Sequence, residues 1–235
     1  DVCSSDLLSQ DPQIGQRWQN RYLMYTHGYG IVASPVTEVG REGLPELLIR
    51  DIPPKAPAGL QITRPEIYYG ELSDDYVIVN TRVNEFDYPA GETNVYTKYQ
   101  GKGGIELSSA WSKLAFAMRL GDYRMLISKE ITNESKVMIY RNVLKRVNRV
   151  APFLRYDHDP YLAISDGKLY WIIDAYTTTM LYPFSPPYDR YLGNYIRNSV
   201  KVTVDAYDGT VTFYLTDETD PIVQTWAKIF PDLFT

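Results

Sequence analysis

A histidine between two carboxylates is the part of the sequence best suited to holding a metal ion. Asp157, His158 and Asp159 follow one another, and in a loop the two carboxylates could bind calcium together with backbone carbonyl groups. With His158 included, the same side chains could bind zinc. Pro160 interrupts the alternating acidic pattern of a typical calcium loop. We therefore predict no cofactor, with calcium or zinc at this loop as the alternative.

A run of basic residues without an intervening acid could contact an anionic surface. Because a cationic helix face suits anionic lipid headgroups, these side chains are candidates for such a contact: Lys136, Arg141, Lys145, Arg146 and Arg149. The alternative is an ordinary solvated helix face whose cations pair with carboxylates elsewhere in the chain.

Two glycine-rich segments imitate nucleotide-binding loops. Gly28, Gly30 and Ala33 have the spacing of a dinucleotide fingerprint, which requires a helix beginning at the glycines. Pro35 favours extended backbone there, so we predict a tight bend between strands. In Gln100–Gly104 no Ser or Thr follows Lys102, unlike in a Walker loop, and we predict a flexible connection.

Two classes of function remain open. The surplus of tyrosine, 21 of 235 residues, suits binding of proteins, wall polymers or lipid headgroups, because tyrosine offers a large amphipathic contact area. The alternative is an envelope hydrolase with acid and base carboxylates drawn from Asp157, Asp159, Asp174 and Asp205. No catalytic motif selects the second class, so we favour a binding module and leave catalysis undecided.

The elements that must position these residues form an α+β pattern. A β-rich part spans 8–104, where many prolines exclude long helices. An α+β part then spans 105–235, either separate from the first or continuous with it. Its predicted elements are helices at about 109–121 and 133–149, antiparallel hairpins at 161–173 and 200–214, each with an Asp-Gly turn, and a short helix at 221–229.

Composition sets the outer limits of function. The formal net charge of −5 argues against a nucleic-acid partner, and no apolar run approaches the length of a membrane helix. Residues 1–7 spell the translation of a common sequencing adapter, so we expect them to be an artefact and the protein to be a fragment. Cys3, the single cysteine, falls in that segment.

Several runs together resemble the uncharacterised protein family 0182 of large bacterial multi-pass membrane proteins. The resemblance lies in 25–30, 49–53, 62–71, 85–89, 101–104, 151–157, 170–178, 194–197 and 204–210, and it is continuous from about Trp18 to the end. It implies a region outside the cytoplasm, attached to the cell membrane through helices upstream, with no assigned reaction. It offers no catalytic residues.

The C-terminal half also resembles two smaller modules. A helix followed by antiparallel hairpins that end in Val204–Val211 is loosely similar to PepSY and cystatin-like modules of extracytoplasmic proteins. This likeness is local and implies a fold alone.

Overall fold

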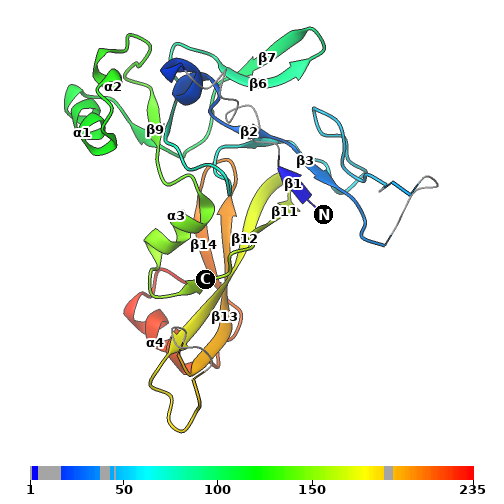
Figure 1. Cartoon of the computed structure of the whole chain (residues 1–235), viewed down its shortest axis with the longest axis vertical. Coiled ribbons are helices and arrows are strands. Elements are labelled where there is room, and N and C mark those ends of the chain that lie inside the picture. The colour runs from blue at the N-terminus through cyan, green and yellow to red at the C-terminus, as the bar shows by residue number, and fades with distance from the viewer. Residues whose placement is uncertain (1, 5–16, 38–42, 45, 188–192) are drawn as a thin grey trace.

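The computed structural model describes residues 2–4, 17–37, 43–44, 46–187 and 193–235, and it has the predicted α+β class (Figure 1). A long antiparallel sheet forms one end of the molecule, and smaller strand pairs and helices form the other. The described helices are a π-helical turn η2 (Asn20–Met24), α1 (Ala110–Leu120), α2 (Arg124–Ile127), α3 (Val143–Val150) and α4 (Pro221–Ile229).

The main sheet contains both predicted hairpins. Its strands are β10 (Arg155–Tyr156), β11 (Tyr161–Ser165), β12 (Lys168–Thr179), β13 (Tyr195–Asp205) and β14 (Val211–Leu215). Strand β12 pairs with β13 and, on its other edge, with β10 and β11, while β14 pairs with β13. Both predicted hairpins are present. Asp166 and Gly167 both have positive φ in the first Asp-Gly turn, whereas in the second only Gly209 does.

Two helices cover the buried side of this sheet. Alternate residues of β12 are buried, including Trp171 and Ile173, and they share a hydrophobic core with Val143 and Val147 of α3 and Val223 of α4. The predicted C-terminal helix is confirmed, because Asp220 caps α4 through the backbone N–H of Ile222 and Pro221 occupies its first turn.

A second, smaller core lies between η2, α1 and α2. A three-stranded sheet of β5 (Val77–Val79), β9 (Lys136–Met138) and β8 (Ile105–Glu106) separates it from the main core. Ile78 and Val137 point into the smaller core, whereas Val77 and Met138 point into the main one. Because successive strand residues face opposite sides, one sheet serves both cores.

Short strand pairs complete the part before residue 104. They are β1 (Val2–Ser4) with β3 (Ile31–Ala33), β2 (Gly28–Tyr29) with β4 (Glu66–Ile67), and β6 (Glu85–Ala90) with β7 (Thr93–Thr97). Gly30 turns the chain between β2 and β3 with φ of +76°, so the predicted bend is confirmed and no helix begins at these glycines.

Three sequence predictions about helices need correction. The helix predicted for 133–149 begins only at Val143, because Lys136–Met138 pairs with β5 and its Val137 fills the smaller core. Asn142 caps that shorter helix. The run 21–26 belongs to the part predicted to be β-rich, but it is partly helical, since η2 buries Leu23 in the smaller core.

The third correction concerns the apolar side of α1. Its ends are as predicted, with Ser109 as N-cap and Gly121 as left-handed C-cap. The spacing of Trp111, Leu114, Ala115 and Met118 in the sequence predicts an apolar side of this helix. Trp111 and Met118 face outward, however, and Ala117 faces the core. No helix in the described part of the chain combines the length and apolarity needed to cross a bilayer.

Candidate functional site

The predicted metal-binding residues lie on the surface after β10. Asp157 accepts a 3.3 Å hydrogen bond from the backbone N–H of Asp159 and a 3.4 Å bond from the Tyr176 hydroxyl, while His158 and Asp159 are exposed. Among the described residues, no three His, Cys, Asp or Glu side chains are arranged to hold a metal ion. The structure therefore gives the calcium or zinc prediction no geometric support.

The five predicted basic contacts do not share one face. Arg141 is buried and donates to the backbone carbonyls of Tyr68, Thr26 and Asp75. Arg146 lies over the Tyr69 ring and donates to the carbonyl of Gly209.

The other three basic residues differ among themselves. Lys145 forms a 2.8 Å ion pair with Asp74, Arg149 lies near the Tyr140 ring, and Lys136 is half-buried on β9. The anionic-surface prediction for this group stays a prediction.

Asp174 and Asp205, two of the four carboxylates considered for hydrolysis, already have partners. Asp174 accepts from Lys201 and Asn198, and the Lys201 ammonium lowers the pKa of Asp174. Asp205 accepts from the backbone N–H groups of Tyr207 and Asp208. A general acid needs a raised pKa, so Asp174 is unsuited to that role.

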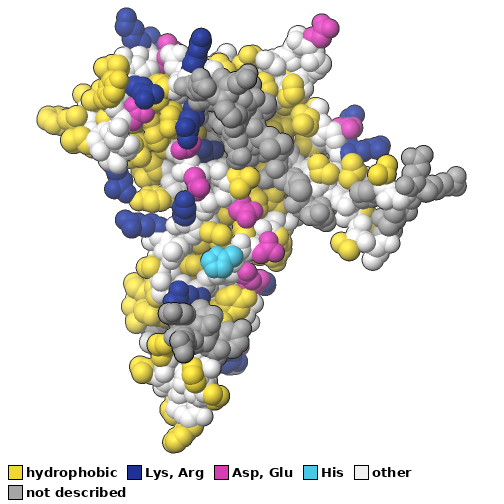
Figure 2. Space-filling view, viewed as in Figure 1, with side chains coloured by type: hydrophobic (Ala, Val, Ile, Leu, Met, Phe, Trp, Pro, Cys, Tyr) yellow, Lys and Arg dark blue, Asp and Glu magenta, His cyan; other side chains and the backbone are white. Residues whose placement is uncertain are grey.

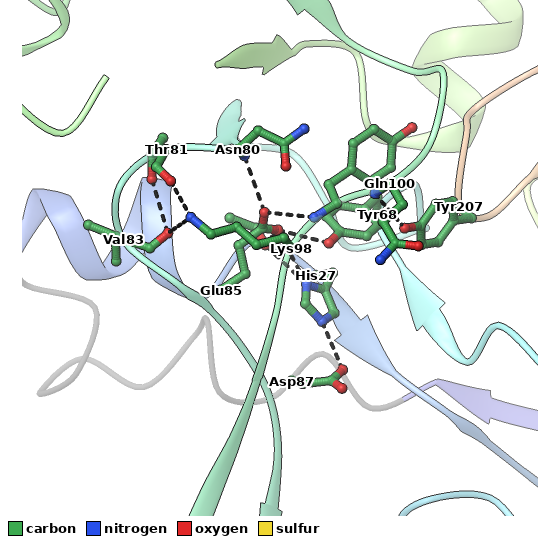
Figure 3. A network of polar contacts seen from close by, with 12 residues as sticks. His27, Tyr68, Asn80, Thr81, Val83, Glu85, Asp87, Lys98, Gln100 and Tyr207 are labelled. Atoms are coloured by element: carbon green, nitrogen blue, oxygen red, sulfur yellow. Dashed lines mark hydrogen bonds and ion pairs between the residues drawn. The ribbon is translucent and has the colours of Figure 1, made fainter. Parts of the chain in front are cut away.

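A fully buried glutamate organises the interior beside β6. The Glu85 carboxylate accepts from the Thr26 and Tyr68 hydroxyls at 2.6 and 2.8 Å and from the backbone N–H groups of Asn80 and Tyr99 (Figure 3). Four donors converge on one carboxylate, which satisfies a group that would otherwise be costly to bury.

His27 extends this network toward the solvent side. Its buried ring lies 3.3 Å from Asp87 through Nε2 and 3.0 Å from the Thr26 hydroxyl through Nδ1. Glu66 is different, because its buried Oε2 atom has no hydrogen-bond partner, and desolvation raises the pKa of its carboxyl group.

Three tyrosine rings connect this network to the main sheet. Tyr68 packs edge-on against Tyr99 and Tyr207, with ring centroids 4.8 and 5.2 Å away, and Tyr99 stacks on Tyr207 at 5.0 Å. The Tyr99 hydroxyl donates to Asp208, and the backbone N–H of Gln100 donates to the Tyr207 hydroxyl. Part of the tyrosine surplus thus joins the two halves of the chain.

The glycine-rich loop is packed, so the predicted flexible connection is wrong. The backbone N–H of Lys102 donates to the Asp208 carboxylate and that of Gly103 to the Tyr99 hydroxyl. A Cβ atom at Gly101 would lie 2.0 Å from the same carboxylate. Glycine is required here because Asp208 and Tyr99 approach the backbone closely.

A cavity of about 150 Å³ lies where this loop meets the two hairpin turns. Its lining residues are Arg64, Gln100, Gly101, Lys102, Lys168, Leu169, Asp205, Tyr207 and Asp208. The Arg64 guanidinium lies 4.6 Å from the centre of the Tyr207 ring. Within the described residues, the side chains of Arg64, Lys102 and Lys168 form no ion pair, whereas both aspartates accept backbone N–H bonds.

Sequence reasoning missed most of this cavity. It singled out Gln100–Gly104 and Asp205 but not Arg64, Lys168 or Tyr207. The sequence signal that could have located the cavity was the order of the two hairpins. If β12 and β13 pair in antiparallel fashion, as they do with Tyr170 opposite Asp205, both Asp-Gly turns lie at the same end of the sheet.

Comparison with known proteins places the whole region in one family. The model of the "Uncharacterised protein family (UPF0182)" matches residues 7–235. The chain belongs to UPF0182. A UPF0182 protein of Pelotomaculum thermopropionicum is 56% identical over 223 residues, covering 95% of this chain and 24% of the relative. A UPF0182 protein of Desulforamulus reducens is 54% identical over 230 residues, covering 97% and 25%.

The match concerns one region of longer proteins. The chain spans about a quarter of the length of these curated UPF0182 relatives. No solved structure matches the chain. The resemblance expected from the sequence motifs is therefore confirmed at the level of the family.

Proposed function

We propose that this region is a binding module and that its cavity accepts an anionic group of an envelope molecule. The observation that carries the proposal is the set of three cations, Arg64, Lys102 and Lys168, which line one cavity without ion-pair partners in the described structure. Cations held near each other repel, and an anion between them relieves that repulsion. The ligand supplies the missing negative charge.

The two carboxylates of the cavity do not cancel this attraction fully. Asp208 accepts from the Tyr99 hydroxyl and the N–H of Lys102, and Asp205 accepts from two N–H groups of its own turn. Their charge is thus partly compensated by the dipoles that hold them.

Calorimetric titration with glycerol 1-phosphate tests the proposal, with glucuronate as the carboxylate probe and glycerol as the neutral control. We expect binding of an anion and none of glycerol. The double variant Lys102→Ala/Lys168→Ala should weaken binding by roughly tenfold or more, because hydrogen bonds to charged groups contribute about 1.5–3 kcal/mol.

A matched double variant separates this effect from a loss of overall charge. Lys129→Ala/Lys228→Ala removes two exposed lysines outside the cavity and should leave the affinity unchanged. Absence of binding by both anions, or equal weakening in the two double variants, would refute the cavity as the site.

We also propose that the region lies on the extracytoplasmic side of a multi-pass membrane protein. The support is the family resemblance together with the much greater length of the relatives. In a full-length parent protein from which all native cysteines have been removed, a Lys228→Cys variant should react with a membrane-impermeant thiol reagent in intact cells. Labelling that requires cell lysis would place the region in the cytoplasm instead.

A further inference from the structure

The outward side of α1 and α2 carries a group of exposed apolar side chains, here named the α1–α2 surface: Trp111, Met118, Tyr123, Leu126 and Ile127. Trp111 is 80% exposed, Met118 70% and Ile127 69%. Figure 2 shows hydrophobic side chains gathered over these helices, at the end of the molecule where Figure 1 places α1 and α2. Exposed apolar groups of this kind mark interaction sites.

The helical spacing shows that this exposure is organised. Trp111 and Met118 lie seven residues apart on α1 and therefore share a face, opposite to Ala117, Phe116 and Leu120, which pack in the smaller core. Helix α2 repeats the arrangement in one turn, with Met125 buried and Leu126 and Ile127 exposed. Each helix thus has an inner apolar side that is covered and an outer one that is not.

Exposed cations surround the α1–α2 surface. Arg119, Arg124 and Lys129 are exposed beside it, and Arg119 donates to the Tyr140 hydroxyl without an ion pair in the described structure. The acidic residue between the helices, Asp122, accepts from Trp18 and Tyr76 and faces Arg124. The charge left toward solvent around the apolar group is therefore positive.

We propose that the α1–α2 surface docks on a bilayer that contains anionic phospholipids. Trp and Tyr favour the headgroup level, apolar side chains enter the acyl boundary, and flanking Arg and Lys attract anionic headgroups. This contact goes beyond the anion-binding cavity and is independent of it, because no residue of the α1–α2 surface lines that cavity.

Charge distinguishes this surface from the exposed apolar loop after β12. The loop after β12 exposes Met180, Leu181 and Phe184 at the opposite end of the molecule, but its described residues 180–187 contain no Lys or Arg. An apolar group with a cationic rim matches an anionic bilayer, whereas apolar side chains without adjacent cations have no such selectivity.

Co-sedimentation with vesicles tests the proposal on the 235-residue chain. We expect the protein to bind vesicles of equal parts phosphatidylglycerol and phosphatidylcholine, and to bind pure phosphatidylcholine vesicles much more weakly. The triple variant Trp111→Ser/Met118→Ser/Ile127→Ser should lose binding to both. The variant Arg119→Gln/Lys129→Gln should weaken binding to the anionic vesicles by roughly tenfold or more, because each surface cation contributes about 1 kcal/mol.

A matched triple variant guards against a general effect of lowered apolarity. Met180→Ser/Leu181→Ser/Phe184→Ser removes three equally exposed apolar side chains from the far loop and should bind like the original chain. Circular dichroism checks that every variant is folded. The proposal is overturned if the original chain binds no vesicles, in which case another protein segment would be the partner of the α1–α2 surface. It is also overturned if the far-loop variant is the one that loses binding.

Discussion

Two glutamates 19 residues apart, Glu85 fully buried and Glu66 half-buried, show how differently one residue type can be used. Glu85 is fully buried and accepts four hydrogen bonds, so its carboxylate holds the segments that follow η2, β4, β5 and β7 around one point. Glu66 buries an oxygen that accepts none. The first is a structural centre, and the second is a site of stored instability.

The Glu66→Gln variant should be more stable than the original chain at neutral pH. Burial raises the pKa of Glu66, so the folded protein favours the protonated carboxyl group over the ionised one. The stability that this protonated group contributes at low pH is lost as the pH rises through the raised pKa. Glutamine removes the charge at nearly the same shape, and we expect a gain of about 1 kcal/mol. Urea denaturation measures it.

The pH dependence provides the control for this variant. Below the ordinary pKa of 4.5, Glu66 is protonated in both states and the advantage of glutamine should vanish. A gain that persists unchanged in acid, or a loss at neutral pH, would show that Glu66 has a partner in solution.

Asp220, unlike Glu66, should stabilise the folded protein in its ionised form. Burial alone would raise its pKa, but hydrogen bonds from Ser199, Thr177 and the N–H of Ile222 outweigh burial and lower it. Its contribution is therefore present above the ordinary value of 3.8 and lost as pH falls through the lowered pKa. Asp220→Asn should cost about 1 kcal/mol at neutral pH, and less as the solution becomes more acidic.

Thermal melts across this acidic range measure the Asp220 effect. Asp232→Asn changes an exposed aspartate after the same helix and should leave stability unchanged at neutral pH. An Asp220→Asn deficit that grows as pH falls would contradict the sign of the linkage.

At the scale of elements, turns were the most predictable features. Both Asp-Gly hairpins and the capped ends of α1 and α4 follow from local chemistry, since turn and cap residues act within a few positions of themselves. The boundary of α3 was not predictable in this way. Val137 has helical spacing with Leu144, but pairing with the distant strand β5 makes it part of a sheet.

Alanine substitutions at two glycines with similar backbone angles distinguish the cost of backbone strain from the cost of overpacking. Gly91 and Gly209 have φ of +64° and +68°, but a Cβ atom would meet nothing near Gly91 and would lie 2.6 Å from the Tyr69 ring at Gly209. Gly91→Ala should cost roughly 1–2 kcal/mol for the left-handed backbone. Gly209→Ala should cost about 1–3 kcal/mol more because of overpacking.

Chemical denaturation of the two alanine variants measures this difference directly. Equal losses would show that the Tyr69 ring moves aside without penalty. A larger loss at Gly91 would contradict the packing around the β13–β14 turn.

At the scale of the whole molecule, the cavity depends on contacts between distant segments. Arg64 and Lys102 come from two loops and Lys168 from the start of β12. The tyrosines 68, 99 and 207 and the register of β12 with β13 bring them together. Sequence spacing could indicate the hairpin turns but not their approach to the glycine loop. The family was predictable, because its motifs are contiguous runs.

The α1–α2 surface shows what the spacing of apolar residues cannot predict. The spacing of Trp111 and Met118 correctly predicted a helix with an apolar face, but it could not tell whether that face meets the core or the outside. The packing of Ala117 and Phe116 in the smaller core decides the orientation of α1, because it leaves Trp111 and Met118 on the outer side.

The most direct test of the central claim, an anion-binding cavity at the hairpin turns, is NMR mapping of glycerol 1-phosphate on the isotopically labelled chain. We expect saturable shifts that cluster at the backbone of Arg64, Lys102, Lys168 and Tyr207 and that disappear in Lys102→Ala/Lys168→Ala. Saturable shifts confined to other parts of the chain, or none at all, would contradict it.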